Sequence, residues 1–414
     1  METISLVRDS RVEALPVLNT AMWAHRRAGL RRLVIILPLL LFVVVNFIVP
    51  ITVMLLRAVE NPELRTAMPQ TAQELREWNG SGLPPADLVR TFSRELGVAE
   101  TAGALGDVAN RLNFDTTGFR TLLFRTARRI QPTDGSLSAL SGIDARWGDR
   151  ETWLKLKRAA APVTSFYLLA AIDRRIDADG SMAPAPPDQA VFLEAFGRTL
   201  WIGAVVTCLC LLLGYPVAYL LSTLPARVSN LLMIVVLLPF WTSILVRTVA
   251  WIVLLQTHGV VNDTLLGLHA VTHPLDLVYN RTGVYIAMTH VLLPYAILPI
   301  YAVMKGISPM PLRAALSLGA TPARVFWTVF APQTLPGVTA GGMIVFVLAL
   351  GYYITPALVG GPRDQMISYF IAYFTNQSLN WGMAAALSLV LLVATLALVL
   401  LYSRLTAAKA LGWR

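Results

Sequence analysis

The sequence predicts an all-α membrane protein whose chain crosses the bilayer six times. Of its 414 residues, 56% are hydrophobic and only 14% are charged, a composition outside the range of soluble globular domains. Six uncharged or nearly uncharged runs have the length of a membrane-spanning helix. They are Leu33–Leu56, Thr199–Ser222, Leu231–Leu255, Gly283–Val303, Gly337–Pro356 and Met383–Ser403. The excess apolar side chains are therefore expected to face lipid.

A polar tail, residues 1–32, precedes the first run. This tail is too long and too polar for the start of a signal peptide, and the run after it is longer than a signal-peptide core. Residues 33–56 are therefore predicted to stay in the protein as the first transmembrane helix.

Residues 57–196 separate the first two runs and differ from both in composition. Acidic and basic residues are nearly balanced there, and long loops of this kind cross the membrane largely regardless of charge. In "FRTLLFRTARRI" and "RETWLKLKRAA" the apolar residues recur at spacings of three and four, which indicates amphipathic helices. We predict an external helical domain with a small core of its own, joined to the membrane by a linker at Asp177–Gln189.

Six spans place both chain ends on the same side of the membrane. Lys and Arg outnumber Asp and Glu in the segments expected on that side, as with Arg26, Arg31, Lys305 and Arg404. The positive-inside rule therefore places the tails 1–32 and 405–414 in the cytoplasm. The same rule accounts for the formal net charge of +10, so the basic composition does not indicate binding of nucleic acid.

The sequence lacks the residues that several kinds of binding or catalytic site require. No lysine follows a glycine, so the chain has no GxxxxGK[ST] loop for nucleotide phosphates. Cys208 and Cys210 point to nearly opposite faces of a helix, which excludes a disulfide or a metal pair. His269 and His273 have a spacing that could hold a metal on a helix, but a polar external loop is the simpler interpretation. No span contains Asp or Glu, which argues against a proton-coupled secondary transporter.

The segment Pro311–Gly337 is predicted to form two short helices joined by a glycine turn. Pro311 suits the first turn of one helix and Gly319 its C-terminal turn, and Thr321 with Pro322 suits the start of a second helix that ends near Phe330. Gln333–Gly337 is expected to redirect the chain into the fifth span.

The first of these helices shows a small apolar face made of Ala314, Ala315 and Leu318. A two-turn helix cannot bury such a face alone, so the face predicts a docking surface for another protein. A helix lying on lipid and a DNA-binding helix-turn-helix are the alternatives, and tethering between two spans disfavours the second.

This segment resembles the cytoplasmic "EAA" loop of ATP-binding-cassette importer permeases. Ala314, Ala315, Gly319 and Leu335-Pro336-Gly337 occupy matching positions, whereas Arg313 stands where the family has glutamate. The resemblance implies that residues 305–336 form a coupling loop that fits a cleft of a separate ATPase. The implied coupling residues are Leu312, Arg313, Ala314, Ala315, Leu318, Gly319, Ala320 and Pro336.

Two further stretches, Leu237–Asn262 and Gly351–Ser368, resemble permease subunits of bacterial spermidine/putrescine importers. The resemblance extends from the second span to the C-terminus and does not include residues 57–196. It implies a type I importer permease with a transmembrane core at 197–404, in the bacterial inner membrane, with residues 57–196 in the periplasm. Opines, ferric iron and sulfonated compounds are alternative cargoes, and a receptor with an external sensing domain is the alternative outside this class.

The resemblance also implies a set of partners and a division of labour. The chain would be a transport subunit and not an enzyme, binding no cofactor itself, while ATP and magnesium bind to a cytoplasmic ATPase dimer. A second permease subunit, in a heterodimer, and a periplasmic substrate-binding protein would complete the assembly. Substrate would then cross by alternating access.

The spans offer a polyamine no carboxylate, so aromatic faces are the expected contacts of a cationic cargo. Arg247 lies well inside the third run, about 24 Å along it from Leu231 at 1.5 Å per residue, where it is predicted to reach the external interface or to act as a gate. The predicted pathway or gate residues are Trp241, Arg247, Trp251, Tyr295, Tyr352 and Tyr353. Packing and interfacial anchoring are the alternative roles of these aromatic residues.

Overall fold

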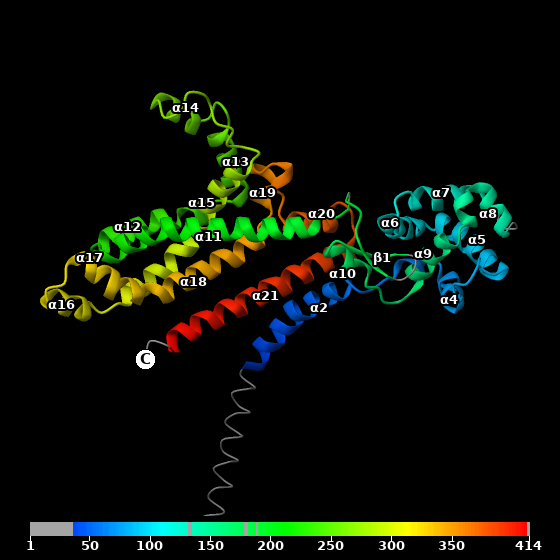
Figure 1. The fold of residues 1–414 in the computed structure, drawn as a ribbon, viewed down its shortest axis with the longest axis horizontal. Coiled ribbons are helices and arrows are strands. Elements are labelled where there is room, and N and C mark those ends of the chain that lie inside the picture. Colours follow the sequence, from blue (N-terminus) through cyan, green and yellow to red (C-terminus); the bar gives the residue numbers. More distant parts are fainter. Residues whose placement is uncertain (1–35, 131–134, 178–180, 188, 412–414) are drawn as a thin grey trace, which may run out of the picture. The chain divides into compact units, whose positions relative to one another are not determined.

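The structure is a computed structural model that describes residues 36–130, 135–177, 181–187 and 189–411, with side chains as far as Arg404. Figure 1 shows that most of these residues are helical. Six helices are long and apolar enough to cross a membrane, which confirms the predicted all-α membrane class. They are Ile36–Leu56, Phe192–Thr223, Ile244–Gly267, Arg281–Gly306, Pro322–Leu350 and Trp381–Arg404. The predicted N-terminal tail lies outside the described residues, as do 412–414.

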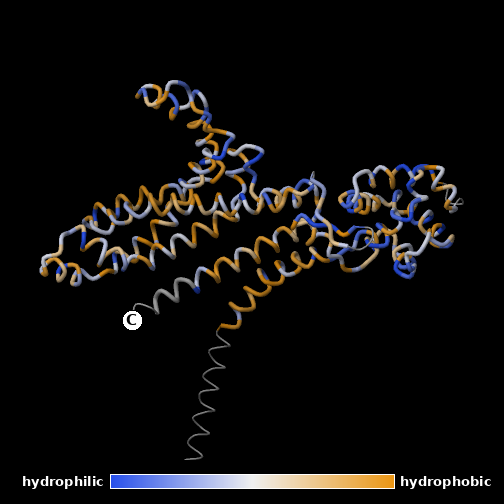
Figure 2. The backbone as a smooth tube through the Cα atoms, in the orientation of Figure 1, coloured by the Kyte–Doolittle hydropathy of each residue, from blue (hydrophilic) through white to orange (hydrophobic). Residues whose placement is uncertain are grey.

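The chain divides into two units, and the first ends at Leu56. Its described part is one helix that includes a π-helical turn, η1 (Val44–Ile48), and α2 (Val49–Leu56). Hydrophobic residues predominate along this helix, as Figure 2 shows, with Asn46 as an exposed polar residue, and its most apolar stretch is not buried within the chain. A helix of this kind suits contact with lipid all round.

The second unit begins at Arg57 with a domain of short helices that carries many of the polar residues in Figure 2. Its elements are α3 (Glu63–Ala67), α4 (Pro69–Glu77), α5 (Ala86–Thr101), α6 (Leu105–Asp115), α7 (Phe119–Arg129), α8 (Leu137–Ile143), η2 (Ala145–Gly148), α9 (Arg150–Ala160) and α10 (Phe166–Ala171). The amphipathic spacing seen in the sequence therefore forms helices here.

This domain has an aromatic centre. The rings of Phe92, Trp147 and Trp153 lie 5.0 to 5.3 Å apart between centroids, and all three side chains are fully buried. Each indole nitrogen has a partner: Trp147 donates to the hydroxyl of Thr126 at 2.8 Å and Trp153 donates to the carbonyl of Trp147 at 2.9 Å. Burial of these rings is a large apolar contribution with no unpaired polar atom.

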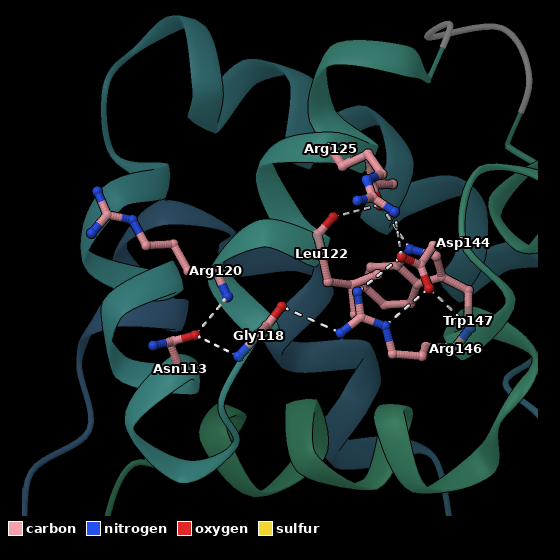
Figure 3. A network of polar contacts seen from close by, with 9 residues as sticks. Asn113, Gly118, Arg120, Leu122, Arg125, Asp144, Arg146 and Trp147 are labelled. Atoms are coloured by element: carbon pink, nitrogen blue, oxygen red, sulfur yellow. Dashed lines mark hydrogen bonds and ion pairs between the residues drawn. The ribbon is translucent and has the colours of Figure 1, made fainter.

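A polar network closes one edge of the domain (Figure 3). Asp144 accepts hydrogen bonds from Nε and Nη2 of Arg146, both at 2.9 Å, and forms an ion pair with Arg125 at 3.3 Å. Arg146 also donates from Nη1 to the carbonyl of Gly118 at 3.3 Å. The Asp144 carboxylate therefore joins α7 to η2, and Arg146 extends the network to the turn before α7 (Figure 3).

The predicted linker differs from the structure in one respect. Strands β1 (Arg174–Ile176) and β2 (Met182–Pro184) form a short antiparallel pair, with Arg175 opposite Ala183. The Gly- and Pro-rich composition suggested irregular chain, but strands of three residues are long enough to form a ladder. Residues 178–180 and 188 of the predicted linker lie outside the described residues.

The rest of the second unit holds the remaining spans and their connections. Its elements are α11 (Phe192–Thr223), α12 (Ala226–Leu237), η3 (Leu238–Trp241), α13 (Ile244–Leu255), α14 (Val260–Gly267), α15 (Arg281–Gly306), α16 (Pro309–Ser317), α17 (Pro322–Val325), η4 (Phe326–Phe330), α18 (Ala331–Leu350), α19 (Ile354–Val359), η5 (Pro362–Asp364), α20 (Ile367–Asn376) and α21 (Trp381–Leu411). Helices α11, α15 and α18 form the central bundle (Figure 1).

Small residues let two helices of this bundle approach closely. A Cβ atom at Gly341 of α18 would lie 2.9 Å from the carbonyl oxygen of Ala296 of α15, which is closer than real Cβ contacts allow. Glycine at this position therefore permits backbone contact between α15 and α18, as is common between membrane helices.

The third predicted span is wrong in its bounds. The run Leu231–Leu255 is interrupted because Thr242 and Ser243 have extended backbone, with ψ near +145° at both, after the short 3-10 turn η3 that contains Pro239. The span Ile244–Gly267 begins with α13, and a turn at Gln256–Gly259 separates α13 from α14. The predicted height of Arg247 in the membrane assumed one unbroken helix from Leu231, which the structure does not have.

Candidate functional site

The predicted glycine turn is present between α16 and α17. Gly319 has φ of +86°, a left-handed conformation that glycine adopts without strain. Ala320 donates to the carbonyl of Ala315 at 3.1 Å, which closes the end of α16. The Thr321 hydroxyl accepts from the amide of Arg324 at 3.4 Å, so it caps α17 as expected.

The second helix of this segment does not end near Phe330. Residues 322–350 form one continuous helix, in which η4 is a π-helical turn between α17 and α18. Pro336 lies inside α18 and not in a turn. The expected change of direction at Gln333–Gly337 is therefore wrong, because prolines are tolerated inside membrane helices when neighbouring groups satisfy the freed carbonyls.

Three large apolar side chains on or beside α16 and in the following turn η4 are exposed in the described chain. No residue of α16 is buried, Leu318 is 88% exposed, and Met310 and Trp327 are 75% and 72% exposed. Ala314 is exposed, whereas Ala315 and Ala320 are half-buried. We call Met310, Leu318 and Trp327 the exposed apolar patch. Such a patch on a connecting loop is typical of a protein contact.

Two of the predicted coupling residues face other ways. Leu312 is half-buried and packs against the cluster around Ile297 and Phe330, so it anchors α16 to the bundle. Arg313 is exposed, and no ion pair to its guanidinium is found in the described part of the chain.

Aromatic side chains that the sequence did not single out attach this segment to α11. The Tyr219 ring lies 5.5 Å from Phe326 and 5.4 Å from Phe330. The Tyr215 hydroxyl lies 3.2 Å from the hydroxyl of Thr334. The spacing of four residues between Phe326 and Phe330 in "FWTVF" was the available signal, because residues i and i+4 of a helix share a face. Their rings are stacked, with centroids 5.7 Å apart.

The predicted pathway residues divide into two groups. Trp251 of α13 donates from Nε1 to Nδ1 of His290 on α15 at 3.1 Å. Arg247 interacts electrostatically with both His290 and Tyr352, and Tyr295 interacts with Tyr352. The structure thus brings Arg247, Trp251, Tyr295 and Tyr352 near one another, together with His290.

Trp241 and Tyr353 make no side-chain hydrogen bond or ring contact with this group in the described part of the chain, although Phe240, beside Trp241, packs on Tyr295. Trp241 ends η3 and its side chain is 89% exposed in the single chain. Tyr353 is 40% exposed at the start of α19. Sequence reasoning also missed the contact between the hydroxyls of Thr248 and Thr355, which are fully buried and 3.1 Å apart, and which join α13 to α19.

Arg247 has an unusual environment. It is the fourth residue of α13, in the first turn, where the helix dipole is positive and a cation is unfavourable. Its Nε and Nη1 atoms are buried and have no hydrogen-bond partner among the described residues. Arg247 as a whole is half-buried, and a guanidinium nitrogen buried without a partner is unfavourable, so a partner from outside the chain would stabilise this position.

No group of three or more metal-ligating side chains is found within the described ranges. His273 contacts the neighbouring Thr272 hydroxyl at 2.9 Å. Cys208 is exposed on α11, while Cys210 is buried and its thiol lies 3.6 Å from the carbonyl of Thr289. These residues give no indication of a metal or redox site.

Known proteins are similar to the part of the chain that contains most of the spans. A family model described as "Binding-protein-dependent transport system inner membrane component" matches residues 211–409. The spermidine/putrescine transport system permease protein PotB of Escherichia coli strain K12 is 31% identical over 214 residues, which cover 52% of this chain and 78% of that protein. The putative 2-aminoethylphosphonate transport system permease protein PhnU of Salmonella choleraesuis strain SC-B67 is 29% identical over 223 residues, covering 54% and 78%.

Among solved structures, the chain resembles a bacterial alginate ABC transporter in complex with an alginate pentasaccharide-bound periplasmic protein. The TM-score is 0.44 and the identity 18%, over 52% of this chain and 78% of that chain. The family match begins inside α11, after the domain of short helices has ended.

Proposed function

This chain belongs to the family of binding-protein-dependent transport system inner membrane components, and on that premise we propose that it is the permease subunit of an ATP-driven polyamine importer. The protein is a multi-pass inner membrane protein. Spermidine or putrescine is the proposed cargo because PotB of Escherichia coli, named for both, shares the identity reported above.

The observation that carries this proposal is the exposed apolar patch on the loop between the fourth and fifth spans. Leu318 and Met310 are held outward by a helix whose Leu312 is packed against the bundle. Ala314 and Ala315 leave room for a partner's backbone beside the patch. We assign the ATPase-coupling contact to this surface. Among the predicted coupling residues, Leu312 then anchors the loop to the bundle, and Pro336 lies outside the contact surface.

The partners follow from this assignment. A separate ATPase dimer binds ATP and magnesium and presses on α16, a second permease subunit completes the pathway, and a periplasmic protein delivers the cargo. Both chain ends then lie in the cytoplasm together with α16, on the side where basic residues are in excess. On this account the chain itself catalyses no reaction.

Movement of α16 can reach the spans through identified contacts. The rings of Phe326 and Phe330 pack on Tyr219 of α11, and α17, η4 and α18 form one helix. A push on α16 is therefore passed to α11 and α18 together, which is what alternating access requires of a stiff connection.

Arg247 favours a second candidate cargo. Its unpaired guanidinium beside His290 and Tyr352 would repel a polycation but would attract a phosphonate or carboxylate. PhnU, a relative of similar identity, is named for 2-aminoethylphosphonate transport. An anionic or zwitterionic cargo is therefore the alternative, with Arg247 as its binding residue and not as a gate against polyamines.

Uptake of radiolabelled putrescine and 2-aminoethylphosphonate by cells that express the complete importer distinguishes the two. The proposal expects ATP-dependent putrescine uptake, and the variant Arg247→Gln to maintain or increase it because a repelling charge is lost. Arg227→Gln, an exposed arginine on α12, is the control and should leave uptake unchanged. If the cells take up only 2-aminoethylphosphonate, and Arg247→Gln reduces that uptake at least tenfold, the cargo is the phosphonate and not a polyamine.

A further inference from the structure

A cavity of about 1180 Å³ lies in the second unit, between the domain of short helices and the first residues of the last span. Residues of α3, α6 and α10 line it, together with residues of α20 and of the start of α21. Its volume is sufficient for a small organic molecule with surrounding water. None of the residues assigned above to coupling or to the pathway lines it.

One arginine in this cavity is held in a fixed position. Arg111 is only 7% exposed, and its Nε donates to the side-chain oxygen of Asn61 at 3.1 Å. Asn61 is itself fixed, because its amide nitrogen donates to the carbonyl of Ala159 at 2.7 Å. The guanidinium carbon lies 4.1 Å from the ring centre of Phe166 and 4.9 Å from that of Tyr167. These contacts orient the guanidinium before any ligand arrives.

The same arginine has an unused donor. Its Nη1 is buried and has no hydrogen-bond partner in the described part of the chain. Glu63 lines the same cavity, and its Oε2 is likewise buried without a partner among those residues. The two side chains do not form an ion pair with each other within 4.0 Å. A buried donor and a buried acceptor of opposite charge thus both lack a partner, at a substantial free-energy cost.

The surroundings of Glu63 agree with an incomplete site. Burial raises the pKa of its carboxyl group, while the charges of Arg111 and Arg57 oppose the rise and Asp107 adds to it. An ammonium group placed against Oε2 would remove this penalty, because an opposite charge favours the ionised carboxylate.

We propose that this cavity binds a free amino acid, whose carboxylate pairs with Arg111 and whose ammonium group pairs with Glu63. A ligand with a single charge would satisfy only one of the two unpaired atoms. The rings of Phe114, Phe370 and Phe374 also line the cavity and offer an apolar surface to the side chain of the ligand. The inference does not depend on the cargo of the importer.

The site is connected to the spans by packed rings. Phe166, which stacks on Arg111, lies 5.9 Å from Phe114, and Phe114 lies 5.7 Å from Phe374 of α20. Tyr167 packs so closely on Gly382, near the start of α21, that a Cβ there would overlap its ring. An amino acid on Arg111 would therefore stabilise the contact between the external domain and the last span.

The test measures binding to the full chain purified in detergent, by calorimetry and by the shift in thermal unfolding temperature. The probes are L-phenylalanine, L-leucine, L-glutamate and L-arginine, which represent the main classes of side chain. 3-Phenylpropionate and 2-phenylethylamine carry one charge each and are matched to phenylalanine, and 4-methylpentanoate and 3-methylbutylamine are matched to leucine in the same way. We expect at least one amino acid to bind, with the single-charge compounds at least tenfold weaker.

Variants locate the site. Glu63→Gln keeps the shape of the side chain and should weaken amino-acid binding at least tenfold, as should Arg111→Gln. Glu77→Gln and Arg128→Gln are the controls, because both residues lie on the exposed surface outside the cavity. If Arg111→Gln does not fold, the binding measured with Glu63→Gln tests the proposal by itself. Absence of binding at millimolar concentration, equal binding of a single-charge compound, or unchanged binding to Glu63→Gln would overturn the proposal.

Discussion

Asp144 shows how one side chain can contribute to the stability of the domain of short helices. The hydrogen bond from Arg146 lowers the pKa of Asp144 from 3.8 to about 2, more than its burial raises it. Its carboxylate also accepts from the amide of Arg146 at 3.2 Å, which caps η2. Because the pKa of the folded state is depressed, this stabilisation is complete above about pH 4 and is lost as pH falls through 2.

Asp144→Asn is therefore expected to lower the free energy of unfolding by about 1–2 kcal/mol at neutral pH, the usual worth of hydrogen bonds to charged groups. Thermal unfolding followed by intrinsic tryptophan fluorescence, to which the nearby Trp147 contributes, measures the change. Asp87→Asn is the control, because Asp87 pairs with Arg90 on the surface and is 82% exposed, so its loss should have little effect. Equal effects of the two substitutions would contradict the role given to the network in Figure 3.

At the scale of elements, the sequence predicts some features of the segment from α16 to α18 and not others. Gly319 and Thr321 are local signals, and both have the predicted conformations. The continuation of α17 into α18 depends on the bundle, which supports a helix through Pro336. Likewise, the break before α13 depends on two ordinary residues, Thr242 and Ser243, whose extended backbone no local pattern specifies.

Gly319→Ala tests the turn by itself. An alanine with φ near +86° is strained by about 1 kcal/mol, although open space surrounds the position. We expect the spans to keep their thermal stability while the reconstituted importer hydrolyses ATP several-fold more slowly, because α16 loses its fixed orientation. Gly306→Ala, at the end of α15 and equally open, is the matched control. A normal rate for Gly319→Ala would show that the turn geometry is not needed for coupling.

At the scale of the second unit, α11 links the two ends of the membrane core. Phe192, at its start, packs on Phe370 of α20, and Tyr219, near its end, packs on Phe326. At 1.5 Å per residue its 32 residues span about 48 Å. The sequence predicts this helix from its apolar run. The aromatic contacts at its ends, and the pairing of Arg111 with Asn61 fifty residues earlier, depend on tertiary structure and could not be predicted.

The central claim is that this chain couples a separate ATPase to transport through the patch on α16. The most direct measurement is recovery of an ATP-binding-cassette ATPase with the tagged, detergent-purified chain, compared with the variant Leu318→Asp. The account predicts that the wild-type chain retains the ATPase and that Leu318→Asp loses it while keeping its folded helix content. Failure of the folded wild-type chain to retain an ATPase, or equal retention by Leu318→Asp, would contradict the account.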